Sequence, residues 1–217
     1  MGDSISVAEF NKIQDDPIHK NMIRRALARN YEEFVEVLYD DLDFAISGLE
    51  LNPQFHQNSD EDTISQFIIQ GIRGYYRVTQ GATGGGNKDI TVEGRERNWM
   101  WIGEAKIYKS ITDLREGWLQ LTTRYKHIDP AKNAAALLAY TFRPDPIKHL
   151  STWREELRQK KIEEYKEKDC TRRTRLAFYS IHKHQDSGYD MPVRHIAINL
   201  SFAPKDRSAR KSEKYKK

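Results

Sequence analysis

Two short apolar segments, residues 84–92 and 101–108, constrain the fold most strongly, because they are predicted to form adjacent strands. Successive side chains of a strand point to opposite faces of a sheet, so Glu104 and Lys106 share one face. Large apolar residues occupy both faces of the second segment, which predicts a central, buried strand. Burying charge is costly unless the charged group is paired or bound to a metal. Glu104 and Lys106 are therefore candidate functional residues.

The register of the predicted hairpin brings a second carboxylate to Glu104. If Val92 pairs with Trp101 across the intervening turn, Asp89 lies directly opposite Glu104. Directly opposed residues of an antiparallel pair have Cβ atoms about 4.5–5.5 Å apart, which lets both carboxylates hold one cation. Mg²⁺ prefers one or two carboxylates together with waters and a substrate phosphate. With Lys106 beside the cation, the pattern predicts a site that cleaves phosphodiester bonds.

A plainer interpretation of the same residues stays open. Asp89 would then be an ordinary turn residue, and Glu104 and Lys106 an exposed ion pair that stabilises the fold by about 0–1 kcal/mol. The apolar residues on both faces of the second segment favour the functional interpretation, because they indicate a strand inside the sheet rather than at its surface.

An acidic residue on one strand and Glu-x-Lys on the next, here Asp89 and Glu104-Ala105-Lys106, resemble the signature of the PD-(D/E)XK nuclease superfamily. The resemblance spans roughly residues 60–142. It implies an α/β fold with a central mixed β-sheet flanked by helices, the restriction-endonuclease-like core. It also implies a metal-dependent nuclease, with DNA favoured over RNA as the substrate.

The same resemblance suggests further site residues. Family members often carry a carboxylate on the helix before the first core strand, and among the acids at 60–62 the position of Glu61 fits this role. A later helix of the family carries a Gln-x-x-x-Tyr-like element, for which Gln120 is the candidate. The match is imperfect, because Tyr125 lies one place late and Lys88 stands where the family pattern has proline.

The resemblance implies a role for each member of the site. Asp89, Glu104, the main-chain carbonyl of Ala105 and Glu61 would hold one or two Mg²⁺ or Mn²⁺ ions. Lys106 would position the attacking water. Compact nucleases of this kind act as effectors of bacterial or phage-related defence and toxin systems, as homo-oligomers or with a partner protein subunit. The alternative is a catalytically silent subunit of the same fold that binds nucleic acid or supports assembly.

Composition and chain order divide the sequence into three parts. Residues 1–50 form an N-terminal helical extension, with a helix over 17–48, residues 51–202 form the nuclease-like domain, and residues 203–217 form a basic, flexible tail. The tail holds seven Lys and Arg residues against two acids, so it would add salt-dependent affinity for nucleic acid. Other predicted elements are a helix over 147–168 and strands over 134–142, 175–181 and 193–202.

The remaining features favour a cytoplasmic protein without a membrane partner. The chain has one cysteine, Cys170, which excludes an intrachain disulfide, and no apolar run approaches the roughly 18 residues of a membrane span. His182, His184 and His195 cluster near the last strands, but no Cys or acid has the spacing that tetrahedral zinc requires. They are interpreted as strand-edge histidines, with a nucleic-acid surface as the open alternative.

Overall fold

The computed structural model describes residues 6–9, 12, 16–82, 87–94, 98–123 and 129–205, apart from the side chains of residues 17, 18, 82 and 87–89. Its helices are α2 (Pro17–Leu27), α3 (Tyr31–Leu51), the 3-10 helix η1 (Pro53–His56), α4 (Glu61–Ile72), α5 (Ile111–Thr123) and α6 (Pro146–Gln159). Its strands are β1 (Arg77–Ala82), β2 (Asn87–Glu93), β3 (Met100–Ile107), β4 (Ala135–Thr141), β5 (Lys166–Asp169), β6 (Ala177–Lys183) and β7 (Asp190–Asn199).

Within the described part of the chain, seven strands form one mixed sheet in the order β1-β2-β3-β4-β7-β6-β5. Strands β3, β4 and β7 run parallel, and the other neighbouring pairs run antiparallel. The three parallel strands therefore end together at one edge of the sheet, which we call the carboxyl edge. This architecture confirms the predicted fold class, an α/β protein with a central mixed sheet flanked by helices.

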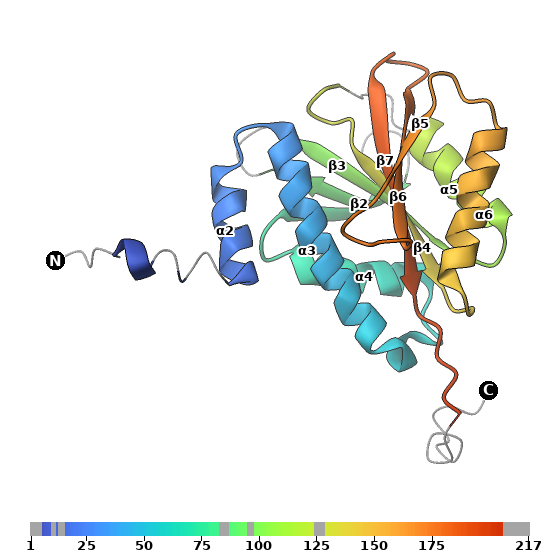
Figure 1. The fold of residues 1–217 in the computed structure, drawn as a ribbon, viewed down its shortest axis with the longest axis horizontal. Coiled ribbons are helices and arrows are strands. Elements are labelled where there is room, and N and C mark those ends of the chain that lie inside the picture. The colour runs from blue at the N-terminus through green and yellow to red at the C-terminus, as the bar shows by residue number, and fades with distance from the viewer. Residues whose placement is uncertain are drawn as a thin grey trace.

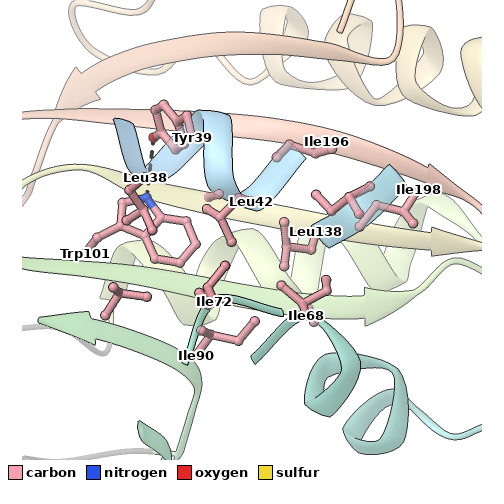
Figure 2. Packing of buried hydrophobic residues seen from close by; sticks show 14 of the residues in the cluster. Leu38, Tyr39, Leu42, Ile68, Ile72, Ile90, Trp101, Leu138, Ile196 and Ile198 are labelled. Atoms are coloured by element: carbon pink, nitrogen blue, oxygen red, sulfur yellow. Dashed lines mark hydrogen bonds between the residues drawn. The ribbon is translucent and has the colours of Figure 1, made fainter. Parts of the chain in front are cut away.

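Helices cover both faces of the sheet (Figure 1). Helices α3 and α4 pack on one face in the larger apolar cluster, which includes Trp101 of β3. Helices α5 and α6 pack on the other face, around Leu137 of β4. Figure 2 shows α3 and α4 meeting the strands, with Trp101 Nε1 donating to the Tyr39 hydroxyl at 3.4 Å. Helix α3, which belongs to the predicted extension over 1–50, is thus part of the central core.

The predicted register of the hairpin is confirmed. Val92 of β2 pairs with Trp101 of β3, and the pairing extends to Ile90 opposite Gly103. Strand β3 lies between antiparallel β2 and parallel β4, and its residues from Trp101 to Ala105 are buried. The prediction of a central, buried strand is therefore confirmed as well.

The prediction of one helix over 17–48 is wrong, because the segment folds as two helices. Helix α2 ends at Leu27 and α3 begins at Tyr31. Asn30 between them has extended backbone, with φ −141°, and its side chain accepts a hydrogen bond from the Glu33 N–H at 2.8 Å. Asparagine is a favoured N-cap because its side-chain oxygen satisfies one of the free N–H groups of the first turn.

The predicted helix over 147–168 is also too long, since α6 ends at Gln159. Lys161 and Glu164 adopt positive φ values of 49° and 51°, the left-handed region that an α-helix cannot continue through. The following residues form β5, an edge strand that pairs antiparallel with β6. Two apolar side chains of this turn, Ile162 and Tyr165, pack against the α5–α6 face. Their burial helps to explain why the chain reverses direction there.

The other predicted elements correspond to the structure with shifted boundaries. The strands expected over 134–142, 175–181 and 193–202 are β4, β6 and β7, and β1 is an addition to them. Of the predicted basic tail, residues 206–217 lie outside the described part of the chain. Among the residues that the structure describes, no helix is long and apolar enough to cross a membrane.

Arg194 of β7 is a fully buried cation beneath α3. Its side chain has no exposed surface, and its Nη2 donates to Asp43 Oδ2 of α3 at 2.8 Å. Its guanidinium carbon also lies 4.8 Å from the centre of the Tyr39 ring. Because a buried charge is costly unless it is paired, this contact ties α3 to the sheet.

We expect Asp43→Ala to lower the free energy of unfolding by about 3 kcal/mol, because it leaves a buried guanidinium without its carboxylate. The matched control is Glu33→Ala in the same helix, which removes an exposed ion pair with Arg29 and should lower the free energy of unfolding much less. Urea denaturation of the three proteins measures both values. Equal losses in the two variants would contradict the role of Asp43.

Candidate active site

The structure brings Glu61, Glu104 and Lys106 together beside the carboxyl edge. Lys106 Nζ lies 3.0 Å from Glu104 Oε1 and 3.2 Å from Glu61 Oε1. Glu104 is only 2% exposed, and the ammonium of Lys106 is largely covered as well. Glu104 and Lys106 compensate each other on the central strand, and Glu61 of another element adds a second carboxylate to the same ammonium.

The N-terminus of helix α4 places Glu61 beside Lys106. Asp60 is the N-cap, and its side chain accepts from the Thr63 N–H at 2.8 Å. Glu61 is the first helical residue, and its Oε2 accepts from the Ile107 N–H at the end of β3 at 2.8 Å. Asp62 is turned toward Gln80 of β1, whose Nε2 lies 3.4 Å from its Oδ1. Of the three acids, Glu61 is the one that reaches Lys106, as its predicted position implied.

Helix α5 fixes the other side of Lys106 through a glycine. A Cβ atom added to Gly117 would lie 2.7 Å from Lys106 Cγ and 2.9 Å from Leu137 Cδ1. Contacts this short do not occur between real Cβ atoms and their neighbours, so the helix can approach the strand this closely only because residue 117 lacks a side chain. The lysine stem is held between the sheet and α5, which restricts where its ammonium can lie.

Gln120 lies one turn further along the same helix. Gly117 packs on Lys106, and Leu121 shares an apolar cluster with Ile102. Helix α5 therefore runs antiparallel to β3 and passes Glu104. The amide oxygen of Gln120 is buried and has no hydrogen-bond partner among the described residues. This position is compatible with the predicted role, and the structure shows no direct contact between Gln120 and the ion cluster.

The remaining predicted site residues are only partly described. Asp89 lies in β2 directly before Ile90, the first residue of β2 that pairs with β3, but its side chain is outside the described part of the structure. Tyr125 lies outside it entirely. The Ala105 side chain points into the core on the opposite face of β3, in the cluster with α3 and α4. The predicted carboxylate pair of Asp89 and Glu104 therefore stays a prediction.

The donor chemistry of the cluster fits a hard divalent cation. Glu61 and Glu104 both direct a carboxylate oxygen at one cationic nitrogen, so the two groups converge on a single point. Oxygen donors of this kind suit Mg²⁺ or Mn²⁺ better than softer metals. Among the described side chains, no group of three or more His, Cys, Asp or Glu residues is placed to hold a metal ion. A metal site here requires the carboxylate of Asp89 or ligands from water and substrate.

A stacked pair of rings lies just beyond the end of β3 and was not predicted from the sequence. The rings of Tyr108 and His149 lie 4.4 Å apart at an interplanar angle of 30°. Thr141 Oγ1 lies 3.3 Å from His149 Nδ1, and burial lowers the pKa of His149 from its usual value. Tyr108 continues the alternation that begins at Glu104 and Lys106, which is a signal the sequence did contain. Nothing in the sequence indicates that His149, from α6, meets it.

The three clustered histidines are core residues and not strand-edge or surface groups. His195 has no exposed surface, its Nδ1 lies 3.0 Å from Trp153 Nε1, and its Nε2 lies 2.8 Å from Ser180 Oγ. Burial lowers the pKa of His195 to about 3 and that of His182 to about 4, so both are neutral at physiological pH. The alternative in which they extend a nucleic-acid surface is wrong, because all three side chains are buried: His182 against α5, His195 against α6 and His184 in the turn after β6.

Comparison with protein-family models, curated proteins and solved structures found no match to this chain. The resemblance to the PD-(D/E)XK superfamily therefore rests on the residues described above.

We expect Gly117→Ala to lower the free energy of unfolding by about 1–3 kcal/mol, because the added methyl group overlaps the Lys106 stem and Leu137. Gly74→Ala is the matched control, since its Cβ would have no neighbour within 4 Å, and it should change stability by no more than about 1 kcal/mol. Urea denaturation compares the two. A Gly117 variant as stable as the control would show that α5 does not hold Lys106 in place.

Proposed function

We propose that this chain is a metal-dependent nuclease that hydrolyses phosphodiester bonds, more readily in DNA than in RNA. The observation that carries the proposal is the buried Glu104 on a central strand, paired with Lys106, which in turn contacts Glu61 of α4. A fold that only needed a stable strand would place apolar residues at these positions, because replacing a buried ion pair by apolar groups is often neutral or stabilising. The presence of Glu104 and Lys106 at these buried positions therefore supports a catalytic role.

Each residue of the cluster has a physical role in this proposal. Glu104 and Glu61, with Asp89 and the Ala105 carbonyl, would hold the Mg²⁺ or Mn²⁺, which polarises a phosphate and lowers the pKa of a bound water. Lys106 lies in contact with both described carboxylates, so its ammonium is positioned to orient the attacking water and offset charge that develops on the phosphate. Gly117 lets α5 cover the stem of Lys106 and exclude water from that side.

The direct test is degradation of supercoiled plasmid, linear DNA and single-stranded RNA by the purified chain with Mg²⁺, Mn²⁺ or EDTA. We expect cleavage that EDTA abolishes and that Glu104→Gln and Lys106→Met each reduce by at least about 100-fold, because each removes a group that acts on the transition state. The matched controls are Glu163→Gln and Lys160→Met, two exposed positions in the segment after α6, which should retain activity.

The outcomes separate the proposal from its alternative. Full activity in Glu104→Gln would contradict the assigned site. Tight nucleic-acid binding without cleavage under any metal condition would favour the catalytically silent binding or assembly subunit.

A positive surface beside the cluster supports nucleic acid as the partner. Lys109 follows β3, Arg143 follows β4, and Lys148 lies in the first turn of α6, so all three lie at the carboxyl edge. All three are exposed, and none forms an ion pair with another described residue. The basic tail starts at the same edge, where the Leu200 N–H donates to the Thr141 carbonyl at 2.8 Å.

Two acids at this edge, Asp113 and Asp145, bond to backbone N–H groups at helix N-termini, and their negative charge offsets part of the positive charge. Asp113 Oδ2 accepts from the N–H groups of Lys109 at 3.1 Å and Ser110 at 2.6 Å. Asp145 Oδ1 accepts from the Lys148 N–H at 3.0 Å. Both carboxylates point toward helix N-termini, so the side chains of Lys109, Arg143 and Lys148 remain available to contact a phosphate backbone.

We expect Lys109→Ala/Arg143→Ala/Lys148→Ala to weaken binding of a DNA duplex by tenfold or more. The dependence of log K on log salt should become shallower by about 2 to 3, since each phosphate contact contributes about 0.9. Lys160→Ala/Lys161→Ala/Lys166→Ala removes the same charge from positions beyond the far end of α6 and is the control. Fluorescence anisotropy in EDTA measures binding without cleavage. Equal effects of the two triple variants would contradict a specific surface.

A further inference from the structure

The stacked rings of Tyr108 and His149 carry two polar atoms that the fold does not use. The Tyr108 hydroxyl and His149 Nε2 form no hydrogen bond with any residue that the structure describes. Neither is one of the enclosed, unpaired polar atoms of the described side chains, so both are open to solvent. With ring centres 4.4 Å apart, the stack brings two free polar groups together at the carboxyl edge.

The fold holds both rings in place. The Tyr108 N–H donates to the Tyr140 carbonyl at 2.8 Å, and the Tyr108 ring packs against the apolar cluster of α5 and α6. Thr141 is buried, and its Oγ1 accepts from the Arg143 N–H and lies 3.3 Å from His149 Nδ1. When the Thr141 hydroxyl donates to Nδ1, the ring proton lies on Nε2. Both free atoms are then hydrogen-bond donors on well-supported side chains.

Strand alternation places Tyr108 in line with the ion cluster. Tyr108 follows Lys106 by two residues, just beyond the end of β3, so the two side chains share a face. At about 3.3 Å per residue, their Cα atoms lie roughly 7 Å apart. This distance is close to the spacing of successive phosphates along an extended nucleic-acid strand.

The surroundings of His149 favour an anion as the ligand. Burial is the main reason why the pKa of His149 is lowered, and the nearby charges of Arg143 and Lys148 act in the same direction. Asp145 opposes them, while its carboxylate accepts from the Lys148 N–H. The ring is therefore neutral at physiological pH and lies among cations. A phosphate oxygen accepts from neutral O–H and N–H donors as well as from Lys and Arg.

We propose that the Tyr108 hydroxyl and the His149 Nε2–H bind the phosphate next to the one that is cleaved. The assignment rests on the proposed nuclease and deepens it, because it adds two positioning residues to that site. By fixing the neighbouring phosphate, the pair sets which phosphodiester bond lies against Glu104 and Lys106. The two donors are neutral, so they contribute geometry, whereas the surrounding cations contribute long-range attraction.

Variants that keep the rings test the pair without removing the stack. Tyr108→Phe and His149→Phe each retain an aromatic ring and lose the polar atom. The full chain is titrated with a fluorescently labelled DNA duplex in EDTA. We expect each variant to weaken binding by about fivefold or more, because hydrogen bonds to charged groups are the stronger ones. Tyr189→Phe, which removes an exposed hydroxyl at the opposite edge of the sheet, is the control and should bind as the wild type does.

The salt dependence separates the pair from the neighbouring cations. The slope of log K against log salt should stay the same in both variants, because a neutral donor releases no counterions. Wild-type affinity in both variants, or a slope as shallow as that of the triple cation variant, would overturn the proposal. Inorganic phosphate at matched ionic strength should not displace the duplex. Displacement would assign the pair to free phosphate and would also count against the proposal.

A small substrate distinguishes positioning from support of the cluster. Bis(p-nitrophenyl) phosphate contains one phosphodiester and no neighbouring phosphate. The ratio of kcat/KM for DNA to kcat/KM for this ester should fall by about fivefold or more in both variants. An unchanged ratio would show that the rings only support the cluster. Because binding is measured in EDTA, a chain that binds through the pair but cleaves nothing would contradict the nuclease alone.

Discussion

The parallel pairing of β3 with β4 and of β4 with β7 is the constraint on which the rest of the structure depends. It needs helices on both faces, and so it buries β3 on both sides. Charged residues in such a strand must be compensated inside the protein. Glu104 and Lys106 compensate each other, and Glu61 arrives from α4 to complete the set. The same pairing makes β3, β4 and β7 end together, which places the carboxyl edge beside the cluster.

The sequence predicted the features that follow from short-range alternation. Apolar residues on both faces identified β3 as central, and pairing Val92 with Trp101 fixed the register, because a shift by one residue would turn every side chain to the wrong face. Choosing Glu61 among three acids also agreed with the geometry, although that choice came from the family resemblance. Asp60 is also acidic, but its carboxylate accepts a hydrogen bond from the Thr63 N–H at the helix N-terminus. Glu61, one position later, instead reaches the end of β3.

Long-range contacts explain what the sequence did not reveal. The stacking of Tyr108 on His149 joins β3 to α6, which only the parallel crossover brings together. His195 looks like a strand-edge residue in the sequence, yet Trp153 and Ser180 satisfy both of its ring nitrogens inside the core. The break between α2 and α3 depends on one asparagine side chain competing with helix continuation, and a hydrophobic pattern does not record that competition.

A continuous route of packed contacts joins Arg194 to the ion cluster. Arg194 holds α3 through Asp43 and also donates to Cys170 Sγ. Helix α3 fixes α4 at a close approach, where a Cβ at Gly71 would lie 2.8 Å from the Ala45 Cβ. Helix α4 begins with Glu61, which contacts Lys106. Arg194, α3, α4 and Glu61 thus form one connected set of close contacts between the far strand β7 and the candidate site.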